Sequence, residues 1–168
     1  MLRLQKLSSD LYTWLSKNKP TETAIEKPSV HFSSASDEWE TPQEFFDAQN
    51  AAFNFTLDVC ATSENAKCKR FFTKADDGLL KSWAGERCWM NPPYGRSIVH
   101  WMKKAYQESL NDALVVCLVP ARTDTAWWHS YAIKGTVTFI RGRLKFSGGK
   151  NSAPFPSALV VFESKLRP

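Results

Sequence analysis

Apolar residues recur along the chain at helical or strand spacing, and this pattern divides it into expected elements. Residues 2–15 carry large apolar side chains at helical spacing, which predicts a short amphipathic helix of about four turns. Residues 16–36 are rich in Lys, Ser, Thr, Pro and Glu and poor in large apolar groups, which is typical of a linker. We therefore expect an amino-terminal helix and linker over residues 1–36 and a folded domain over residues 37–168.

Within the expected domain, short apolar runs alternate with helical patterns, as in α/β domains built on a largely parallel sheet. The expected helices cover residues 42–53, 97–110 and 123–133. The expected strands cover residues 55–60, 87–90, 113–119, 136–140 and 158–162. The run at 113–119 stops at Pro120 and indicates a central strand buried on both faces. Residues 141–157 contain Gly and Pro, and we expect a hairpin or loop there.

The first helix of this domain has a recognisable start signal. Thr41 precedes Pro42, and Glu44 follows three residues after Thr41. This is the spacing of a capping box with proline at the first helical position. The sequence therefore predicts that the Thr41 side chain caps this helix.

The composition fits one globular domain with a polyanionic partner. Of the 168 residues, 43% are hydrophobic, and 22 basic against 17 acidic side chains give a formal charge of +5. A moderately basic protein suits a polyanion such as nucleic acid, although charge alone does not establish one. No apolar run reaches the roughly 18 residues needed to span a membrane, and the pattern of a signal peptide is missing. We expect a cytoplasmic protein with no membrane partner.

The four cysteines do not predict a metal site. They lie far apart without a Cys-x-x-Cys pair, and His100 and His129 do not complete a zinc spacing. We expect reduced, mostly buried thiols. They are Cys60, Cys68, Cys88 and Cys117.

The tetrapeptide Asn91-Pro92-Pro93-Tyr94 directly follows an expected strand and carries the candidate chemistry. An exocyclic amine is a poor nucleophile because its lone pair is delocalised into the ring, so a catalyst needs acceptors that favour a tetrahedral nitrogen. The prolines make a stiff turn that aims the oxygens of Asn91 and Pro92 at one point, and Tyr94 offers a ring on which a base can stack. We expect methylation through positioning and preorganised dipoles. A rigid strand-to-helix turn is the alternative interpretation.

The chain resembles the phage-type DNA N6-adenine methyltransferase family over residues 38–163. Short stretches carry the likeness, and their order agrees as well as their content. They are EWETP at 38–42, LDVCA at 57–61, DGL at 77–79, NPPYG at 91–95, PARTDT at 120–125 with Trp128-His129, GRLKF at 142–146 and APFPSA at 153–158.

The resemblance implies a fold, a cofactor and a substrate. The fold is a Rossmann-like class I methyltransferase, with a mostly parallel central sheet, helices on both faces and an antiparallel hairpin near the carboxyl terminus. The cofactor is S-adenosylmethionine, the target is the N6 amine of adenine in DNA, and the protein is expected to be encoded by a phage or prophage. Ligands of open α/β sheets lie outside the carboxyl ends of the strands, which agrees with this placement.

The cofactor site implied by the resemblance draws on three stretches of the chain. Its expected residues are Trp39, Thr41, Pro42, Asp58, Cys60, Ala61 and Asp77. Asp58 is expected near the methionine part of the cofactor and Asp77 near its adenine. No Gly-x-Gly follows the strand, so Cys60 and Ala61 must serve as the small residues there. Core packing of Trp39 and an ordinary strand-end turn at Asp58 remain alternatives.

Basic residues beyond the central strand are the expected DNA contacts. Arg122 is placed to meet a phosphate or the base, with a salt bridge to Asp124 or another acid as the alternative. Arg141, Arg143, Lys145 and Lys150 form a basic stretch suited to the DNA backbone, with a solvated hairpin as the alternative. Trp127, Trp128 and His129 are expected to form the packing face of their helix.

Other functions use the same tetrapeptide or the same fold. Cytosine N4, adenine in RNA and a glutamine amide in a protein are planar amines that a similar turn can hold. A DNA-binding module with a methyltransferase fold and no turnover is an alternative of a different class. The family resemblance favours adenine in DNA, and the sequence carries no signal for an oligomeric state.

Overall fold

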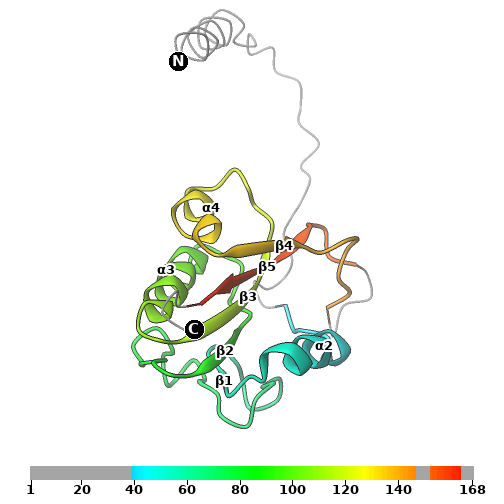
Figure 1. Ribbon diagram of the computed structural model, residues 1–168. Helices are drawn as coiled ribbons and strands as arrows, with labels where there is room; N and C mark the ends of the chain where they lie inside the picture. The colour runs from blue at the N-terminus through cyan, green and yellow to red at the C-terminus, as the bar shows by residue number, and fades with distance from the viewer. Residues whose placement is uncertain (1–38, 147–151, 164–168) are drawn as a thin grey trace, which may run out of the picture. The chain divides into compact units, whose positions relative to one another are not determined.

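The computed structural model describes residues 39–146 and 152–163 (Figure 1). The expected amino-terminal helix and linker, and Lys150 of the basic stretch, lie outside the described residues. The described elements are α2 (Gln43–Phe53), β1 (Leu57–Asp58), β2 (Arg87–Met90), α3 (Ile98–Ser109), β3 (Leu114–Pro120), α4 (Ala126–Ser130), the 3-10 helix η1 (Ala132–Lys134), β4 (Thr136–Phe139) and β5 (Ser157–Phe162). The protein is therefore of the mixed α/β class that the sequence predicts.

The strands form one sheet in the order β1-β2-β3-β5-β4. β1 pairs in parallel with β2, and β2 pairs in parallel with β3. β5 runs antiparallel to both β3 and β4, so it is the single reversed strand among the five described. The antiparallel pair predicted near the carboxyl terminus is thus present. Because β1, β2 and β3 run in the same direction, their carboxyl ends meet at one edge of the sheet. There β1 ends at Asp58, and Asn91 and Ala121 follow β2 and β3.

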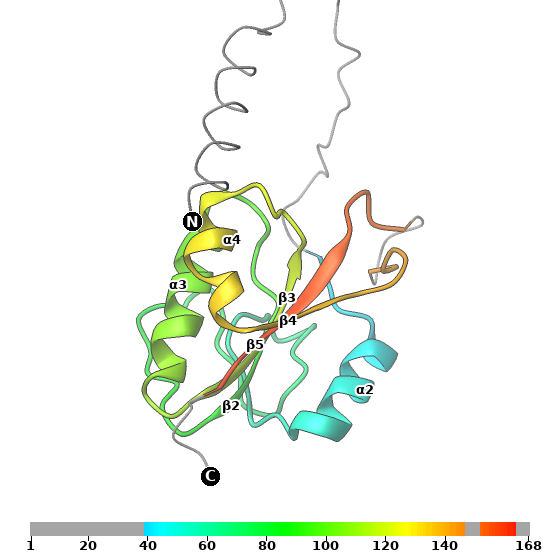
Figure 2. The same ribbon diagram turned by 45° about the horizontal axis from the view of Figure 1, so that its top comes forward.

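The sheet is covered by helices on both faces. In Figure 2, α2 lies on one side of the sheet, while α3 and α4 lie on the other. Phe46 of α2 packs edge-on against Trp89 of β2 with ring centroids 5.5 Å apart. All seven residues of β3 are buried, as its unbroken apolar sequence predicts for the centre of the sheet. Apolar residues of β1, β2 and β3 therefore belong to one hydrophobic core, which supports the edge where these strands end.

Two elements differ from the sequence expectation. β1 is only two residues long, because the chain after Asp58 turns away and returns beside the strand, where Phe71 makes a parallel bridge to Asp58. The helix expected over residues 123–133 is divided into α4 and η1, since Tyr131 between them adopts φ −131° and ψ −54°, outside the helical range.

The predicted capping box at the start of α2 is wrong. The helix begins at Gln43, Pro42 is its cap residue, and no side chain makes a capping hydrogen bond. The hydroxyl of Thr41 instead accepts a hydrogen bond from Asn91, which lies far away in the sequence. The local spacing predicted a helix cap, but the hydroxyl oxygen of Thr41 is engaged in a tertiary contact instead.

Among the described residues, no helix is long and apolar enough to cross a membrane.

Candidate active site

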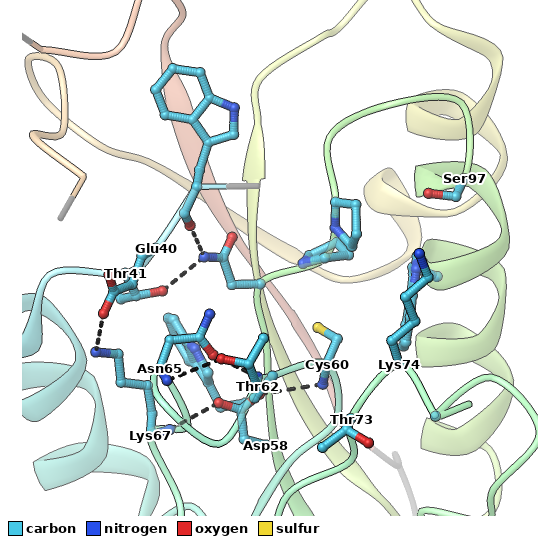
Figure 3. A pocket seen from close by; sticks show the side chains of 18 of the residues that line it. Glu40, Thr41, Asp58, Cys60, Thr62, Asn65, Lys67, Thr73, Lys74 and Ser97 are labelled. Carbon is cyan, nitrogen blue, oxygen red and sulfur yellow. Dashed lines mark hydrogen bonds and ion pairs between the residues drawn. The ribbon is translucent and has the colours of Figure 1, made fainter. Parts of the chain in front are cut away.

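A cavity of about 830 Å³ lies at the carboxyl ends of β1 and β2. This size is within the usual range for small-molecule and cofactor sites. In Figure 3, Glu40 and Thr41 lie on one side of the cavity and Lys74 and Ser97 on the other, with Asp58 and Cys60 between them. Of the sequence-predicted residues, the cavity is lined by Trp39, Thr41, Asp58, Cys60, Ala61, Asp77, Asn91, Pro92 and Pro93. The fold therefore brings the catalytic and cofactor candidates into one place.

Pro42 and Tyr94 are the predicted residues of these two groups that do not line the cavity. Pro42 serves at the start of α2, where its carbonyl accepts a hydrogen bond from the Phe46 amide at 3.1 Å. Trp39 packs against the core and also borders the cavity. Its ring packs edge-on against Phe146 and Phe155, with ring centroids 5.3 and 5.0 Å away.

The side chain of Asn91 is held by hydrogen bonds at both ends of its carboxamide. Its Nδ2 donates to the backbone carbonyl of Trp39 and, at 2.9 Å, to Oγ1 of Thr41. Its Oδ1 accepts from the hydroxyl of Tyr94 at 2.8 Å. Because a carboxamide nitrogen has two hydrogens and its oxygen two lone pairs, one acceptor position on Oδ1 remains.

Tyr94 is packed into the core and positions Asn91. The side chain is 2% exposed, and Phe155 and Phe146 meet its ring edge-on at 5.5 and 6.2 Å. Burial raises the pKa of Tyr94 well above its ordinary value, so the hydroxyl stays protonated and can donate to Asn91. The stacking face predicted for this ring is covered in the structure. Stacking on a base remains a prediction, and it requires Phe146 and Phe155 to move.

Asp58 is a buried carboxyl group with few stabilising contacts. It is 3% exposed, and within residues 39–146 and 152–163 its oxygens accept only from the backbone amides of Lys67 at 3.0 Å and Cys60 at 3.3 Å. Burial raises the pKa of Asp58 to about 6, and the two amides and the charge of Lys67 offset only part of this effect. A carboxylate held this way suits a cationic ligand, because such a ligand supplies the missing charge.

The loop after β1 presents small neutral groups, as the glycine-poor sequence requires. Burial raises the pKa of the Cys60 thiol well above its ordinary value, so this side chain is uncharged. Ala61 is also buried, and its amide donates to the carbonyl of Phe72 at 2.9 Å. The loop is thereby fixed against the returning segment near Phe71 and leaves room at the end of β1.

Lys67 and Gly78 are among the lining residues that sequence reasoning missed. The Nζ of Lys67 reaches Oε1 of Gln43 at 3.2 Å and Oε1 of Glu40 at 3.8 Å. A Cβ at Gly78 would lie 2.3 Å from the carbonyl oxygen of Val59. No signal in the sequence marks Lys67. The Asp-Gly pair at residues 77–78 is a turn signal that could have identified Gly78.

The predicted DNA-contacting residues lie outside the cavity. Arg122 is exposed and donates through Nη1 to the backbone carbonyl of Tyr94 at 3.2 Å, which joins the ends of β2 and β3. Within the described residues it makes no ion pair with Asp124 or another acid. Arg141, Arg143 and Lys145 are exposed. Trp127 and Trp128 are buried, which confirms their predicted packing role, whereas His129 is exposed.

None of the described parts of the chain gathers three or more His, Cys, Asp or Glu residues in an arrangement that could hold a metal ion. The cysteines are free thiols, with Cys88 and Cys117 buried and Cys60 and Cys68 half-buried. Two of the four expected buried thiols are thus enclosed by the core, while the other two remain partly exposed.

Comparison with known proteins gives a consistent family. Residues 29–166 match the family described as DNA N-6-adenine-methyltransferase (Dam). A DNA N-6-adenine-methyltransferase of Haemophilus phage HP1 (strain HP1c1) is 32% identical over 140 residues, which cover 77% of this chain and 80% of the phage protein. Another of that description, from Escherichia phage T1, is 33% identical over 95 residues, or 55% of this chain and 39% of the phage protein. The putative methyltransferase YfdM of Escherichia coli (strain K12) is 31% identical over 87 residues, or 46% of this chain and 96% of that protein. The chain belongs to the DNA N-6-adenine-methyltransferase family.

Proposed function

We propose that the cavity at the ends of β1 and β2 is the active site of this adenine-specific DNA methyltransferase, where S-adenosylmethionine and the N6 amine of adenine meet. One observation carries the proposal: the buried carboxyl of Asp58 and the constrained carboxamide of Asn91 line the same cavity. The carboxyl of Asp58 suits a cationic ligand, and the carboxamide oxygen of Asn91 can accept a hydrogen bond from an amine.

The proposed fold is the Rossmann-like class I methyltransferase fold. Its support is the parallel order of β1, β2 and β3, helices on both faces and a cavity outside the strand ends. Open α/β sheets bind ligands at that edge because the loops leaving adjacent parallel strands diverge there.

The residues of the cavity fit the chemistry of the cofactor. When bound, S-adenosylmethionine supplies an electrophilic methyl group on a sulfonium. Among the residues that the structure describes, no side-chain cation is bonded to Asp58, since Nζ of Lys67 is directed to Glu40 and Gln43. An ammonium group on the ligand would restore the missing charge. Trp39 and Asp77 complete the proposed cofactor site from the neighbouring walls.

Asn91 and Pro92 are proposed to hold the target amine. The remaining acceptor position on Oδ1 of Asn91 takes one amine hydrogen, and the carbonyl of Pro92 takes the other. Within the part of the chain that the structure describes, no hydrogen bond engages the Pro92 carbonyl. Two acceptors favour a tetrahedral nitrogen, whose lone pair then points at the methyl group. Transfer would break the bond between the methyl group and the sulfonium sulfur and leave a neutral thioether, and the cationic methylated amine would then lose its proton to water.

DNA is the proposed macromolecular substrate, and four basic residues are the proposed contacts. Arg122, Arg141, Arg143 and Lys145 are exposed, so their charges are accessible to phosphates. Arg122 directly contacts the proposed catalytic loop, because its guanidinium donates a hydrogen bond to the carbonyl of Tyr94.

The test is incubation of the purified protein with unmethylated DNA and S-adenosylmethionine, followed by nucleoside mass spectrometry. We expect N6-methyldeoxyadenosine from the wild type. Asn91→Ala should lower the rate by about 100- to 1000-fold, since it removes a preorganised acceptor, and should leave cofactor affinity nearly unchanged. A methyl group on cytosine, methylation of RNA alone, or more than half of wild-type turnover in Asn91→Ala would contradict the proposal.

A further inference from the structure

We propose that Thr41 is a positioning residue for methyl transfer, which acts through Asn91 and not by contacting the cofactor. Its hydroxyl, with the backbone carbonyl of Trp39, fixes the rotation of the Asn91 carboxamide so that Oδ1 is presented to the amine. The inference rests on the proposed function, in which Asn91 is the acceptor.

The orientation of the carboxamide follows from the partners at its two ends. The carbonyl of Trp39 can only accept, so the group facing it must be the Nδ2 amine. A half-turn of the carboxamide would bring Oδ1 against that carbonyl and replace an attraction with a repulsion. Thr41 takes the second hydrogen of Nδ2 at 2.9 Å. The nitrogen is then fully used, and Asn91 can act only as an acceptor toward a ligand.

Thr41 is also held in place by contacts that do not involve Asn91. It is 2% exposed, and its neighbours Glu40 and Gln43 are bound by Lys67, at 3.8 and 3.2 Å respectively. Lys67 belongs to the loop after β1, and its amide donates to Asp58. The segment that carries Thr41 is thus anchored independently of Asn91. Rotation of Asn91 would separate Nδ2 from a fixed acceptor.

The local sequence also indicates that this hydroxyl serves a tertiary role. Thr41 has the sequence spacing of a capping threonine, but α2 begins at Gln43 with Pro42 at the cap position, so the Thr41 hydroxyl is not used as a helix cap. The hydroxyl is 2.9 Å from Nδ2 of Asn91 instead. The hydroxyl is therefore free of a local helical role and available to the distant Asn91 side chain.

Thr41→Val and Thr41→Ser test the proposal in the full-length protein. Valine keeps the shape and removes the oxygen, and serine keeps the oxygen. We expect Thr41→Val to lower kcat about tenfold or more, with the dissociation constant for S-adenosylmethionine within about twofold of wild type. Thr41→Ser should retain most of the wild-type kcat. The matched control is Thr56→Val, since the hydroxyl of Thr56 bonds Glu86 outside the cavity.

Each result has a defined meaning. Weaker cofactor binding with unchanged kcat in Thr41→Val would make Thr41 a cofactor contact and overturn the proposal. Equal losses in the valine and serine variants would also overturn it, because the hydroxyl would not be the cause. No methyladenine from the wild type would instead refute the proposed function.

Asn91→Asp gives a second test that does not depend on Thr41 variants folding well. A carboxylate oxygen in the place of Nδ2 would face the carbonyl of Trp39, whereas a protonated carboxyl could donate to it. We expect kcat of this variant to fall about 100-fold or more at pH 8 and to rise as the pH is lowered. Wild-type activity at pH 8 would overturn the proposal, because it would show that no donor is needed at that position.

Discussion

At the scale of single residues, the buried environment of Asp58 disfavours its charged form. Its pKa is raised to about 6 by burial, so the folded protein holds a proton there more tightly than the unfolded chain does. Protonation of Asp58 therefore adds to the free energy of unfolding. This contribution, on the order of 3 kcal/mol, is fully present below about pH 4 and is lost as the pH rises through about 6. A cost of this kind at neutral pH is typical of a residue retained for function.

Cofactor binding is expected to depend on pH through the same carboxyl. If the charged form of Asp58 pairs with the ammonium of S-adenosylmethionine, affinity should strengthen as the pH rises from 5 to 7, and binding should release a proton near pH 6. Calorimetry in two buffers with different ionisation enthalpies measures both quantities. In Asp58→Ala the affinity should be weaker and independent of pH over this range. An unchanged pH profile in Asp58→Ala would show that another group is responsible.

At the scale of elements, the apolar pattern predicted most of the sheet. The unbroken apolar run locates β3, which extends one residue further than expected and includes Pro120, and the run before Asn91 locates β2. Both are buried strands, for which hydrophobicity is the dominant signal. The pattern could not show that β5 lies between β3 and β4, because strand order depends on packing between distant segments. It could not show the short β1 for a similar reason, since the returning loop ends that strand.

The candidate site was predictable where residues follow strand ends and not where distant loops meet. Asp58 and Asn91 terminate adjacent parallel strands, so topology alone brings them together. Lys67 reaches the cavity only through the fold of the loop after β1, which has no periodic pattern. The buried hydroxyl of Tyr94 was likewise unpredictable, because an aromatic ring after two prolines is compatible with stacking on a ligand or with core packing.

Gly78 connects the turn at residues 77–79 to the end of β1. A Cβ at this position would lie 2.3 Å from the backbone oxygen of Val59, a distance that requires the turn to move. We expect Gly78→Ala to displace Asp77 from the cavity wall and to weaken S-adenosylmethionine binding about tenfold or more, or about 1.4 kcal/mol. Titration calorimetry measures this change.

Gly85→Ala is the matched control for that substitution. Gly85 has a φ of +74°, but no atom lies within 4 Å of the place that a Cβ would take, so alanine adds backbone strain without a collision. Its melting temperature should fall while its cofactor affinity stays at the wild-type value. Wild-type cofactor affinity in Gly78→Ala would show that the turn tolerates displacement and that Asp77 is not part of the cofactor site.

At the scale of the whole molecule, the basic stretch at residues 141–145 is connected to the active site by packing. Phe146 follows it directly, is buried, and contacts the rings of both Trp39 and Tyr94. The carbonyl of Leu144 accepts a hydrogen bond from the amide of Ala153 at 2.8 Å, which joins the two arms of the segment between β4 and β5. DNA bound by this stretch would therefore lie next to the catalytic loop.

Replacing Arg141, Arg143 and Lys145 together with alanine tests that arrangement. Each phosphate contact with duplex DNA contributes about 0.9 to the slope of log affinity against log salt, because binding releases condensed counterions. Loss of three contacts should lower the slope by roughly 2 to 3, about equally on all DNA sequences. Methylation at saturating DNA should survive, since Asn91 is untouched. Fluorescence anisotropy over a range of salt concentrations provides the slopes.

The control removes the same number of exposed positive charges elsewhere, at Lys69, Lys81 and Lys103. If net charge alone attracts DNA, both triple variants should lose affinity equally, whereas local phosphate contacts predict a much larger change in slope for the first. A wild-type slope after the change at residues 141–145 would exclude that stretch as the phosphate-binding surface. Arg122 would then be the better candidate, because its guanidinium already lies at the carbonyl of Tyr94 and a phosphate bound there would be adjacent to the target base.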